Sequence, residues 1–546
     1  MLQREIRMSE PTLTYLANWI ANLKYEDIPS KSLRAARLQV LDMIAAVYAS
    51  SRLEEAQAVE RGALASTGEH GRATLLSTGK KTNPVDAAAI NAAYSMAQDF
   101  DDIIWMGHTG HSSVFASLAV AEHEDANTRE FLTAVVVANE VAGRLGASCF
   151  LGPLNGQMIT HIHLIGAAAA TAKLLKLGTE QTTHALAISL SQPVFALQPA
   201  FMAPSSKLLS AATPTKIGIQ AAYFAREGIT GEPTLLEDSR GFWNTFAFIP
   251  LPDMMKDLGE FWAIQTLSMK TYPGCHYFQT ACTAIKMIRE KRKDFELNEI
   301  VSVQIATTKF GIEVNRFGAE YSSRSDEITA VNVNFDLATT AAILLHAGKL
   351  TSHEVDSVWL STHAEVIQMI RKKITVTHDP ALTLMVLKSG KALPTGRKAL
   401  GKLTLSNLLK LRARYSKDYH SSLFSPKELG KWLQVGAHEL FQKSALLAKG
   451  DFTLNSAIPL YFPNRVTIQF GDGTRETVQV DLPVGAFCSP LVESAIREKF
   501  LREAGHHLPP EMAAIAFESG LELESLSLSR FLAMLERTGL AITHSR

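Results

Sequence analysis

The hydrophobic pattern changes its period along the chain, and this change constrains the fold more than any other feature. Through the first half, apolar residues recur at helical spacing, as at Leu16, Trp19, Ile20 and Leu23. From about residue 300 they alternate with polar residues, as at 301–305, which is typical of half-buried strands. The chain is therefore predicted to be mainly α, with a large all-helical domain interrupted by a smaller α+β domain.

Local signals place several of these helices. Ser32 is positioned to cap a second helix, and the alanine-rich stretches 86–97 and 167–177 are predicted to pack closely against neighbours. Gly178 is expected at the C′ position after the second stretch, with Thr179 beginning the next helix.

The strongest strand signal is a hairpin formed by 465–470 and 474–480 around an Asp-Gly turn. Residues 373–377 also alternate, and helical patterns return at 490–501 and 527–535. We therefore divide the chain into a helical domain at 1–264, an α+β domain at 265–482, and C-terminal helices at 483–546 that rejoin the helical domain.

A basic segment interrupts the second domain at about 386–455. Between Lys388 and Lys449 there are 13 Lys and Arg residues but three acidic ones, and helical patterns occur at 403–411 and 432–447. We interpret it as an inserted helical excursion with a solvated basic face. The alternative is a docking surface for an acidic partner or a nucleic acid, but no base-stacking pattern of aromatic residues accompanies the charges.

Charge and cysteine content exclude several classes of protein. Lys and Arg together number 54, as do Asp and Glu, so the basic excess of a nucleic-acid-binding protein is absent. The four cysteines show no CxxC spacing, which argues against a disulfide framework and a zinc-thiolate site. We expect no signal peptide and no membrane span, because the most apolar stretch, 164–172, is short. A cytoplasmic location is the expectation.

The densest group of chemically active residues is Asp99-Phe-Asp-Asp-Ile-Ile-Trp-Met-Gly-His108-Thr-Gly-His111-Ser-Ser. It lies between two apolar helical patterns, and a loop clamped between packed helices holds side chains rigidly. The competing interpretation is a helix cap with buried histidines. A metal site built from His108, His111 and Asp101 or Asp102 is an alternative hypothesis that we do not favour, because no established ligand spacing is present.

Histidines and lysines farther along the chain complete the set of candidates. His161 and His163 point to the same side if their stretch is extended. Lys207 and the run Lys270-Thr-Tyr-Pro-Gly-Cys-His276 supply ammonium groups. With nearby carboxylates and imidazoles, these residues suit a di- or tricarboxylic acid, since neutralising its carboxylates makes an adjacent C–H more acidic.

The ordered motifs resemble the MmgE/PrpD family of 2-methylcitrate dehydratases, cis-aconitate decarboxylases and iminodisuccinate epimerases. The resemblance covers most of 10–380 and resumes at about 463–505. It rests on Asp99-Phe-Asp-Asp with His111-Ser-Ser, Asn139-Glu-Val-Ala-Gly-Arg-Leu-Gly, Leu235-Leu-Glu-Asp-Ser-Arg-Gly-Phe-Trp and Lys270-Thr-Tyr-Pro-Gly-Cys-His. It implies a helical domain with a smaller α+β lid domain, an active site between them, a homodimer, and no metal or organic cofactor.

The resemblance also implies site residues. Asp99, His111, Lys207 and Lys270 match the family's active-site aspartate, loop histidine, substrate-facing lysine and lid lysine. Three positions depart from its decarboxylases: Ile103 replaces a threonine, Cys275 a histidine and Phe335 a lid tyrosine. Each loss of a hydrogen bond would cost on the order of 1–3 kcal/mol of transition-state binding, so cis-aconitate decarboxylation is not the expected reaction.

The sequence-based hypothesis is a hydro-lyase that removes water from a small hydroxy-polycarboxylate such as 2-methylcitrate. Lys207 and Lys270 would hold carboxylates, His111 would be the general base oriented by Asp99, and His276 or His108 would protonate the leaving hydroxyl. The other predicted substrate-binding residues are Asp102, His161, Cys275 and Phe335. Alternatives are an epimerase, isomerase or decarboxylase of a related acid, and a catalytically silent binding protein with this fold.

Overall fold

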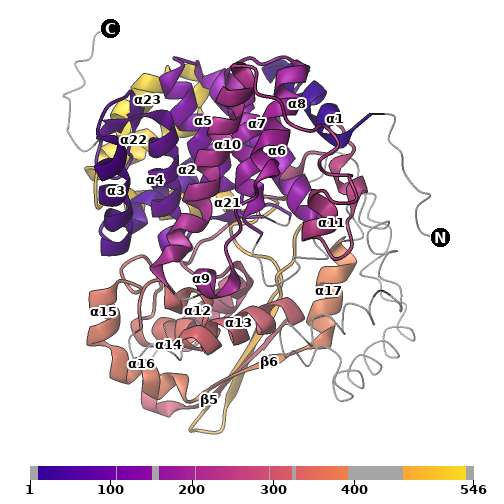
Figure 1. Ribbon diagram of the computed structural model, residues 1–546. Helices are drawn as coiled ribbons and strands as arrows, with labels where there is room; N and C mark the ends of the chain where they lie inside the picture. The colour runs from indigo at the N-terminus through magenta and orange to yellow at the C-terminus, as the bar shows by residue number, and fades with distance from the viewer. Residues whose placement is uncertain are drawn as a thin grey trace.

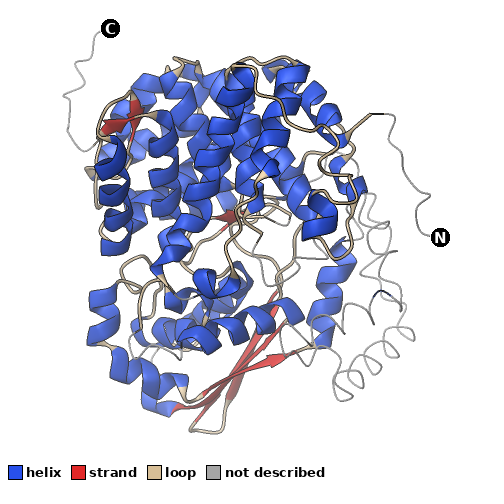
Figure 2. Ribbon diagram, in the orientation of Figure 1, coloured by secondary structure: helices blue, strands red, loops and turns tan. Residues whose placement is uncertain are grey.

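The computed structural model describes residues 10–105, 107–149, 159–202, 204–293, 295–322, 328–390, 407 and 459–536. The predicted mainly-α fold is confirmed, since helices fill most of the described chain and strands are few (Figure 2). Two hydrophobic cores organise it, a large one among the helices and a smaller one beside the sheet. Figure 1 shows the helical body above and the sheet-containing region below.

The helical body is built from long helices that pack along each other. They are α1 (Thr12–Asn22), α2 (Ser30–Ser50), α3 (Glu54–Thr67), α4 (Pro84–Ala97), α5 (Gly110–His123), α6 (Thr128–Ser148), α7 (His161–Leu174), α8 (Thr179–Ser191) and α10 (Leu209–Arg226). Small residues allow close approach: a Cβ on Gly218 of α10 would lie 2.3 Å from the Leu164 carbonyl oxygen of α7. In the alanine-rich helices α4 and α7, small side chains likewise allow close packing against the neighbouring helices.

Helices from the C-terminal part of the chain pack against α2. They are α21 (Val492–Ala504), α22 (Pro510–Leu521) and α23 (Leu528–Leu535). Phe500, Phe517 and Phe531 join the large core, and the Tyr48 hydroxyl donates to the Leu535 carbonyl oxygen at 2.8 Å. The helical body thus contains residues from both ends of the described chain.

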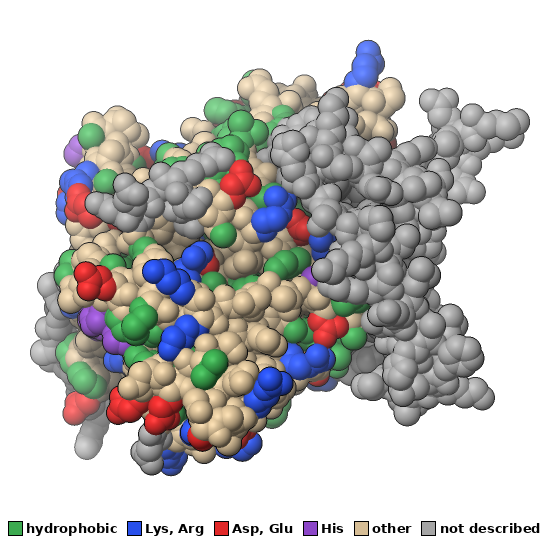
Figure 3. Space-filling model, turned by 90° about the horizontal axis from the view of Figure 1, so that it is seen from below, with side chains coloured by type: hydrophobic (Ala, Val, Ile, Leu, Met, Phe, Trp, Pro, Cys, Tyr) green, Lys and Arg blue, Asp and Glu red, His purple; other side chains and the backbone are tan. Residues whose placement is uncertain are grey.

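The smaller region is a four-stranded sheet with helices against it. The strands are β5 (Ile300–Thr307), β6 (Ile374–His378), β7 (Asn464–Phe470) and β8 (Arg475–Val480), in the order β6-β5-β7-β8. Strand β6 is parallel to β5, whereas the other neighbours are antiparallel. Helices α12 (Gln279–Lys291) and α14 (Leu337–Ala347) share its core, with α13 (Lys309–Ser322), α15 (Ser357–Thr362), α16 (Ala364–Arg371) and α17 (Pro380–Gly390) around it. Figure 3 shows acidic and basic side chains intermixed on the underside.

Most local predictions are confirmed, including the helices near 86–97 and 490–501 and the Asp-Gly hairpin between β7 and β8. Two cap placements are wrong. Ser32 lies inside α2, which begins at Ser30 after the N-cap Pro29. Gly178 is not at C′, because α7 ends at Leu174 and Gly178 is the N-cap of α8 with φ −70°. The division at 264 and 482 stays a prediction. The predicted helices 403–411 and 432–447 lie outside the described residues, apart from residue 407. No helix among the described residues is long and apolar enough to span a membrane.

Candidate active site

The loop between α4 and α5 carries the predicted cluster in an unusual backbone conformation. Asp99 has φ 52°, in the left-handed region that costs a non-glycine residue about 1–3 kcal/mol. Asp102 and Ile103 then form β3, which pairs with β4 (Ser268–Met269), so Lys270 follows directly on the neighbouring strand. This pairing brings residues 99–103 and 270 together although they are far apart in sequence.

Two buried lysines hold the carboxylates of this loop. Lys207 Nζ lies 2.8 Å from Asp99 Oδ1, and Lys270 Nζ lies 2.8 Å from Asp99 Oδ2 and 2.5 Å from Asp101 Oδ1. Both lysine side chains are completely buried. Lys207 comes from a short 3₁₀ turn, Ser205–Leu208, immediately before α10. The arrangement is a compact network of alternating charges.

The two lysines differ in the hydrogen-bonding capacity that they retain. Lys270 Nζ donates to the Asp99 carbonyl oxygen and to both carboxylates, which uses all three N–H groups of an ammonium. Lys207 Nζ donates to Asp99 alone among the described residues. Its ammonium lies 4.6 Å from the ring centroid of Phe335 and 5.5 Å from that of Phe201. Lys207 therefore retains N–H groups without a partner in the described part of the chain, whereas all three N–H groups of Lys270 are in use.

Asp101 lies against both loop histidines. Its Oδ2 is 2.8 Å from His108 Nδ1 and 3.0 Å from His111 Nε2. His111 is fully buried, and its Nδ1 lies 2.7 Å from the Ser95 hydroxyl of α4. The His108 side chain is 37% exposed, and its Nδ1 also lies 2.7 Å from the Asp102 carbonyl oxygen. Since both acceptors face Nδ1, that atom carries the proton of a neutral His108 and Nε2 has the free lone pair.

The charges explain the ionisation of the cluster. Burial alone would raise the pKa of Asp99, but Lys207 and Lys270 lower it to about 2, and Lys270 with the histidines holds the pKa of Asp101 well below its usual range. Burial lowers the pKa of His108, but the Asp101 carboxylate outweighs it and the net direction is upward. Burial lowers the pKa of Lys207. An ionised Asp101 thus favours a proton on His108.

Asp102, for which substrate binding stays a prediction, connects the loop to the helices. Its carboxylate accepts from Gln39 Nε2 at 2.5 Å and from the Gly110 backbone N–H at 3.1 Å. Burial and the neighbouring Asp101 raise its pKa. A side chain at Gly110 would meet Asp102 Oδ2 at 2.4 Å, so the start of α5 requires glycine. These contacts give Asp102 a positioning role.

The segment after Lys270 borders the cluster. Gly274 has φ 106°, and its N–H donates to the carbonyl oxygens of Gln98 and Asp99 at 3.1 and 3.3 Å. Burial and the charge of Asp99 raise the pKa of the Cys275 thiol to about 12, so it stays protonated. His276 is buried with no hydrogen-bond partner at either ring nitrogen among the described residues, and burial and the Lys270 charge lower its pKa well below the usual range. It is a neutral imidazole.

His161 and His163 lie in the first turn of α7 rather than in an extended stretch. The prediction that their side chains point to the same side is therefore wrong, because residues two apart in a helix face different directions. The His163 Nδ1 lies 3.0 Å from the Ser112 hydroxyl, and its ring centroid is 5.7 Å from that of His111. The His161 ring packs against Phe242 and Phe246, at centroid distances of 5.1 and 4.2 Å. His161 is therefore in an aromatic pocket, and no described contact joins it to the lysines.

The His161→Phe variant is expected to lose less stability than the wild type between pH 7 and pH 5. Burial lowers the pKa of His161 to about 3, so the unfolded chain takes up this proton near pH 6.5 while the folded chain does not. Protonation of the unfolded chain therefore costs the wild type about 2 kcal/mol over this interval. Urea unfolding at the two pH values measures the difference. The exposed His353→Gln control should behave as wild type; equal losses in all three proteins would contradict the prediction.

Two of the family-like motifs have structural roles. In the motif at 139–146, Glu140 accepts from the backbone N–H groups of Ala263 and Ile264, both at 2.9 Å. Arg144, 1% exposed, donates to the carbonyl oxygens of residues 254, 256, 257 and 261. In the motif at 235–243, a Cβ on Gly241 would lie 2.2 Å from the Leu235 carbonyl oxygen. The first motif fixes the chain that leads into β4 and Lys270.

Asp101 and Ser95 are site residues that the sequence did not single out for these roles. The sequence suggests only a metal-ligand role for Asp101, because its contact with two histidines depends on the folded loop. We expected Asp99 to orient His111. In the structure Asp101 contacts His111 instead, because the carboxylate of Asp99 is paired with the two lysines. Within the described parts of the chain, no three His, Cys, Asp or Glu side chains are grouped to hold a metal ion.

A protein-family model and several curated proteins are similar in sequence to parts of this chain. Residues 14–250 match the model of the MmgE/PrpD N-terminal domain. A cis-aconitate decarboxylase-like protein, oryM, of Aspergillus oryzae is 26% identical over 285 residues, covering 48% of this chain and 58% of the relative. A cis-aconitate decarboxylase of Aspergillus terreus is 25% identical over 294 residues, covering 50% and 60%. The chain therefore spans about three fifths of the length of the curated relatives it matches.

The fold and the matches together define this chain as a mainly helical protein with enzymes among its relatives. Its residues 14–250 form an MmgE/PrpD N-terminal domain, as the match to that family model shows.

Proposed function

We propose that this protein is a lyase that removes water from a small hydroxy-polycarboxylate by cofactor-free proton transfer. The observation that carries the proposal is that one network contains both Lys207, whose ammonium has N–H groups without a partner among the described residues, and the partly exposed Asp101–His108 dyad. Lys207 binds a substrate carboxylate. Its positive charge stabilises the negative charge that develops when the adjacent C–H is deprotonated.

His108 is the proposed proton-transfer group, in place of His111. Its Nε2 takes the proton from carbon, and Asp101 stabilises the imidazolium that results. The electron pair of the C–H bond forms the C=C bond, and the C–O bond breaks. The departing hydroxide takes the proton back from His108 and leaves as water. The neutral His276 is placed to hydrogen-bond the substrate, because neither ring nitrogen has a described partner.

Decarboxylation of an unsaturated tricarboxylate is the second candidate, because two curated relatives carry the name cis-aconitate decarboxylase. Against it, Ile103, Cys275 and Phe335 offer fewer hydrogen bonds than the residues expected in the family's decarboxylases. An epimerase would use the same proton abstraction and return the proton to the other face. A silent binding protein would have no use for the free His108 nitrogen.

Proton NMR in heavy water distinguishes these reactions on a panel of 2-methylcitrate, citrate, cis-aconitate and iminodisuccinate. A new vinyl signal from a hydroxy acid is the expected result and identifies the dehydratase. Loss of an α-proton signal without an alkene would identify the epimerase, and loss of carbon dioxide the decarboxylase. If no acid binds or exchanges a proton, the enzyme proposal is wrong.

The His108→Gln variant should slow the reaction found in that panel by about 10²–10⁴-fold, because it lacks the basic ring nitrogen. Binding of the acid, measured by calorimetry, should change little because Lys207 remains. The matched control is His184→Gln on α8, whose Nδ1 lies 3.1 Å from the Gly231 carbonyl oxygen, away from the cluster. A His108→Gln variant with wild-type turnover would remove His108 from the mechanism while leaving the reaction itself established.

A further inference from the structure

A buried lysine from α21 touches the backbone of the carboxylate loop. Lys499 is 1% exposed, and its Nζ donates to the Phe100 carbonyl oxygen at 2.6 Å and to Asp42 Oδ1 at 2.7 Å. The same ammonium lies 3.9 Å from the centroid of the Phe100 ring. Phe100 separates Asp99 from Asp101, the two residues that contact the lysines and the histidines. Lys499 thus reaches the centre of the site from a helix 399 residues away in sequence.

The position of this contact matters because the loop is strained. Asp99 has φ 52°, and such a conformation persists only where its surroundings hold it. Two successive carbonyl groups are held by buried ammonium groups, that of Asp99 by Lys270 and that of Phe100 by Lys499. Fixing both peptide groups fixes the directions in which the Asp99 and Asp101 side chains leave the backbone.

The ion pair itself is poorly arranged for stability. Asp42 Oδ2 has no hydrogen-bond partner among the described residues, and Asp42 and Lys499 are both buried. Attraction in a buried ion pair repays the loss of hydration only where the geometry is good and the remaining polar atoms are satisfied, and apolar replacements are often neutral or stabilising. Stability alone therefore gives no reason for a lysine here, whereas the Phe100 carbonyl does.

We propose that Lys499 is a positioning residue for the proposed reaction: it holds the Phe100 carbonyl so that Asp101 meets His108 and His111, which makes α21 part of the active site. The inference rests on the proposed function for its effect on turnover. Its effect on the geometry of Asp101 can be measured without any turnover.

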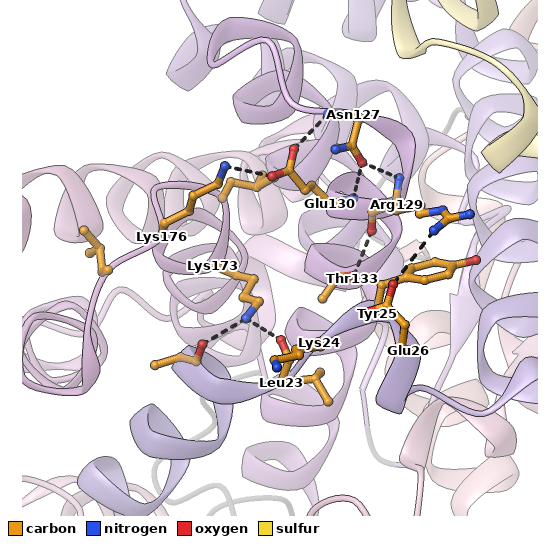
Figure 4. A pocket seen from close by; sticks show the side chains of 13 residues that line it. Leu23, Lys24, Tyr25, Glu26, Asn127, Arg129, Glu130, Thr133, Lys173 and Lys176 are labelled. Atoms are coloured by element: carbon orange, nitrogen blue, oxygen red, sulfur yellow. Dashed lines mark hydrogen bonds and ion pairs between the residues drawn. The ribbon is translucent and has the colours of Figure 1, made fainter.

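The test compares a charge-neutral double variant with a matched control. Lys499→Met alone leaves Asp42 buried and unpaired and can fail to fold, so Asp42→Asn with Lys499→Met is the working variant. The control is Lys173→Met. Lys173 also donates to backbone carbonyls, those of Ile20, Ala21 and Leu23 at 2.6–3.2 Å, but beside the surface pocket of Figure 4. It reports what loss of a carbonyl-binding lysine does outside the site.

Two readouts separate positioning from general destabilisation. In the double variant, kcat should fall at least tenfold while the Kd for the acid, held by Lys207, stays within about threefold, a split typical of lost transition-state contacts. The ¹³Cε1 resonances of His108 and His111 should shift. Lys173→Met should lower Tm and leave kcat and both resonances as in the wild type.

The outcomes that overturn the proposal are distinct from failure of the proposed function. If the wild type turns over no acid, the proposed function is wrong, and the histidine resonances alone decide about Lys499. Resonances that coincide in the wild type and the folded double variant overturn the proposal, as does unchanged kcat. Equal shifts in Lys173→Met would also overturn it, because the change would then follow from destabilisation.

Discussion

Replacement of Lys270 by methionine is expected to lower the free energy of unfolding by about 3–5 kcal/mol at pH 7. The substitution leaves the buried Asp99 and Asp101 carboxylates without the ammonium that each of them contacts. Urea denaturation measures the loss. Lys207 stays on Asp99, so Asp101 bears most of the uncompensated charge.

The pH dependence of this loss has a defined sign. In the wild type the pKa of Asp99 is about 2 and that of Asp101 lies well below its usual range, so both are below their values in the unfolded chain. The contacts of Lys270 with these carboxylates therefore stabilise the protein above about pH 4, and this stabilisation is lost as the pH falls through the folded-state pKa values. The difference between the variant and the wild type should therefore be largest at neutral pH and shrink below pH 4.

The matched control for Lys270 is Lys291→Met, whose ammonium pairs with Glu476 at 2.5 Å but is 65% exposed. An exposed pair contributes about 0–1 kcal/mol, so this variant should unfold nearly as the wild type does. Equal losses in the two variants would show that the buried network does not depend on Lys270.

The second large effect is expected for Arg144→Met. The change removes the donor for four backbone carbonyls of 254–261 and the buried partner of Glu140, at 3.4 Å. We expect a loss of about 3–5 kcal/mol in unfolding free energy, because the partners of a buried charge are left unsatisfied. Thermal unfolding measures it.

Arg129→Met is the control on the same helix, α6. Arg129 is 60% exposed, and its guanidinium lies 3.8 Å from Glu26. Its loss should change the unfolding free energy by less than about 1 kcal/mol. A small effect of Arg144→Met would contradict the role of this motif as the clamp on the chain before β4.

The helices and strands were predictable because each repeats a local pattern. Leu13, Leu16 and Ile20 recur on one buried face of α1, and β7 alternates between the core and the surface as its sequence does. The position of Gly178 was predicted wrongly because glycine occurs at both ends of helices, and its backbone angle depends on where α7 ends. The parallel pairing of β6 with β5 is a long-range contact with no local signal.

The structure brings several of the predicted site residues together, while their roles in a reaction stay predictions. One network contains Asp99, Lys207, Lys270, His108 and His111, and Asp101 joins its lysines to its histidines. Which carboxylate faces which base depends on the left-handed backbone at Asp99, and spacing does not reveal that. Lys499 was missed because a lone lysine in a helical pattern is usually at the surface.

The origin of Lys499 has a consequence for biosynthesis. A ribosome adds on the order of 5–20 residues per second, so Lys499 is joined to the chain roughly 20–80 s after Phe100, which lies 399 residues earlier. During that interval the nascent helices have neither the ammonium that binds the Phe100 carbonyl nor the apolar side chains of α21 that cover α2. Until α21 is synthesised, the apolar surface of α2 that it covers stays exposed on the unfinished polypeptide. Transiently exposed surface of this kind is what chaperones bind on emerging chains.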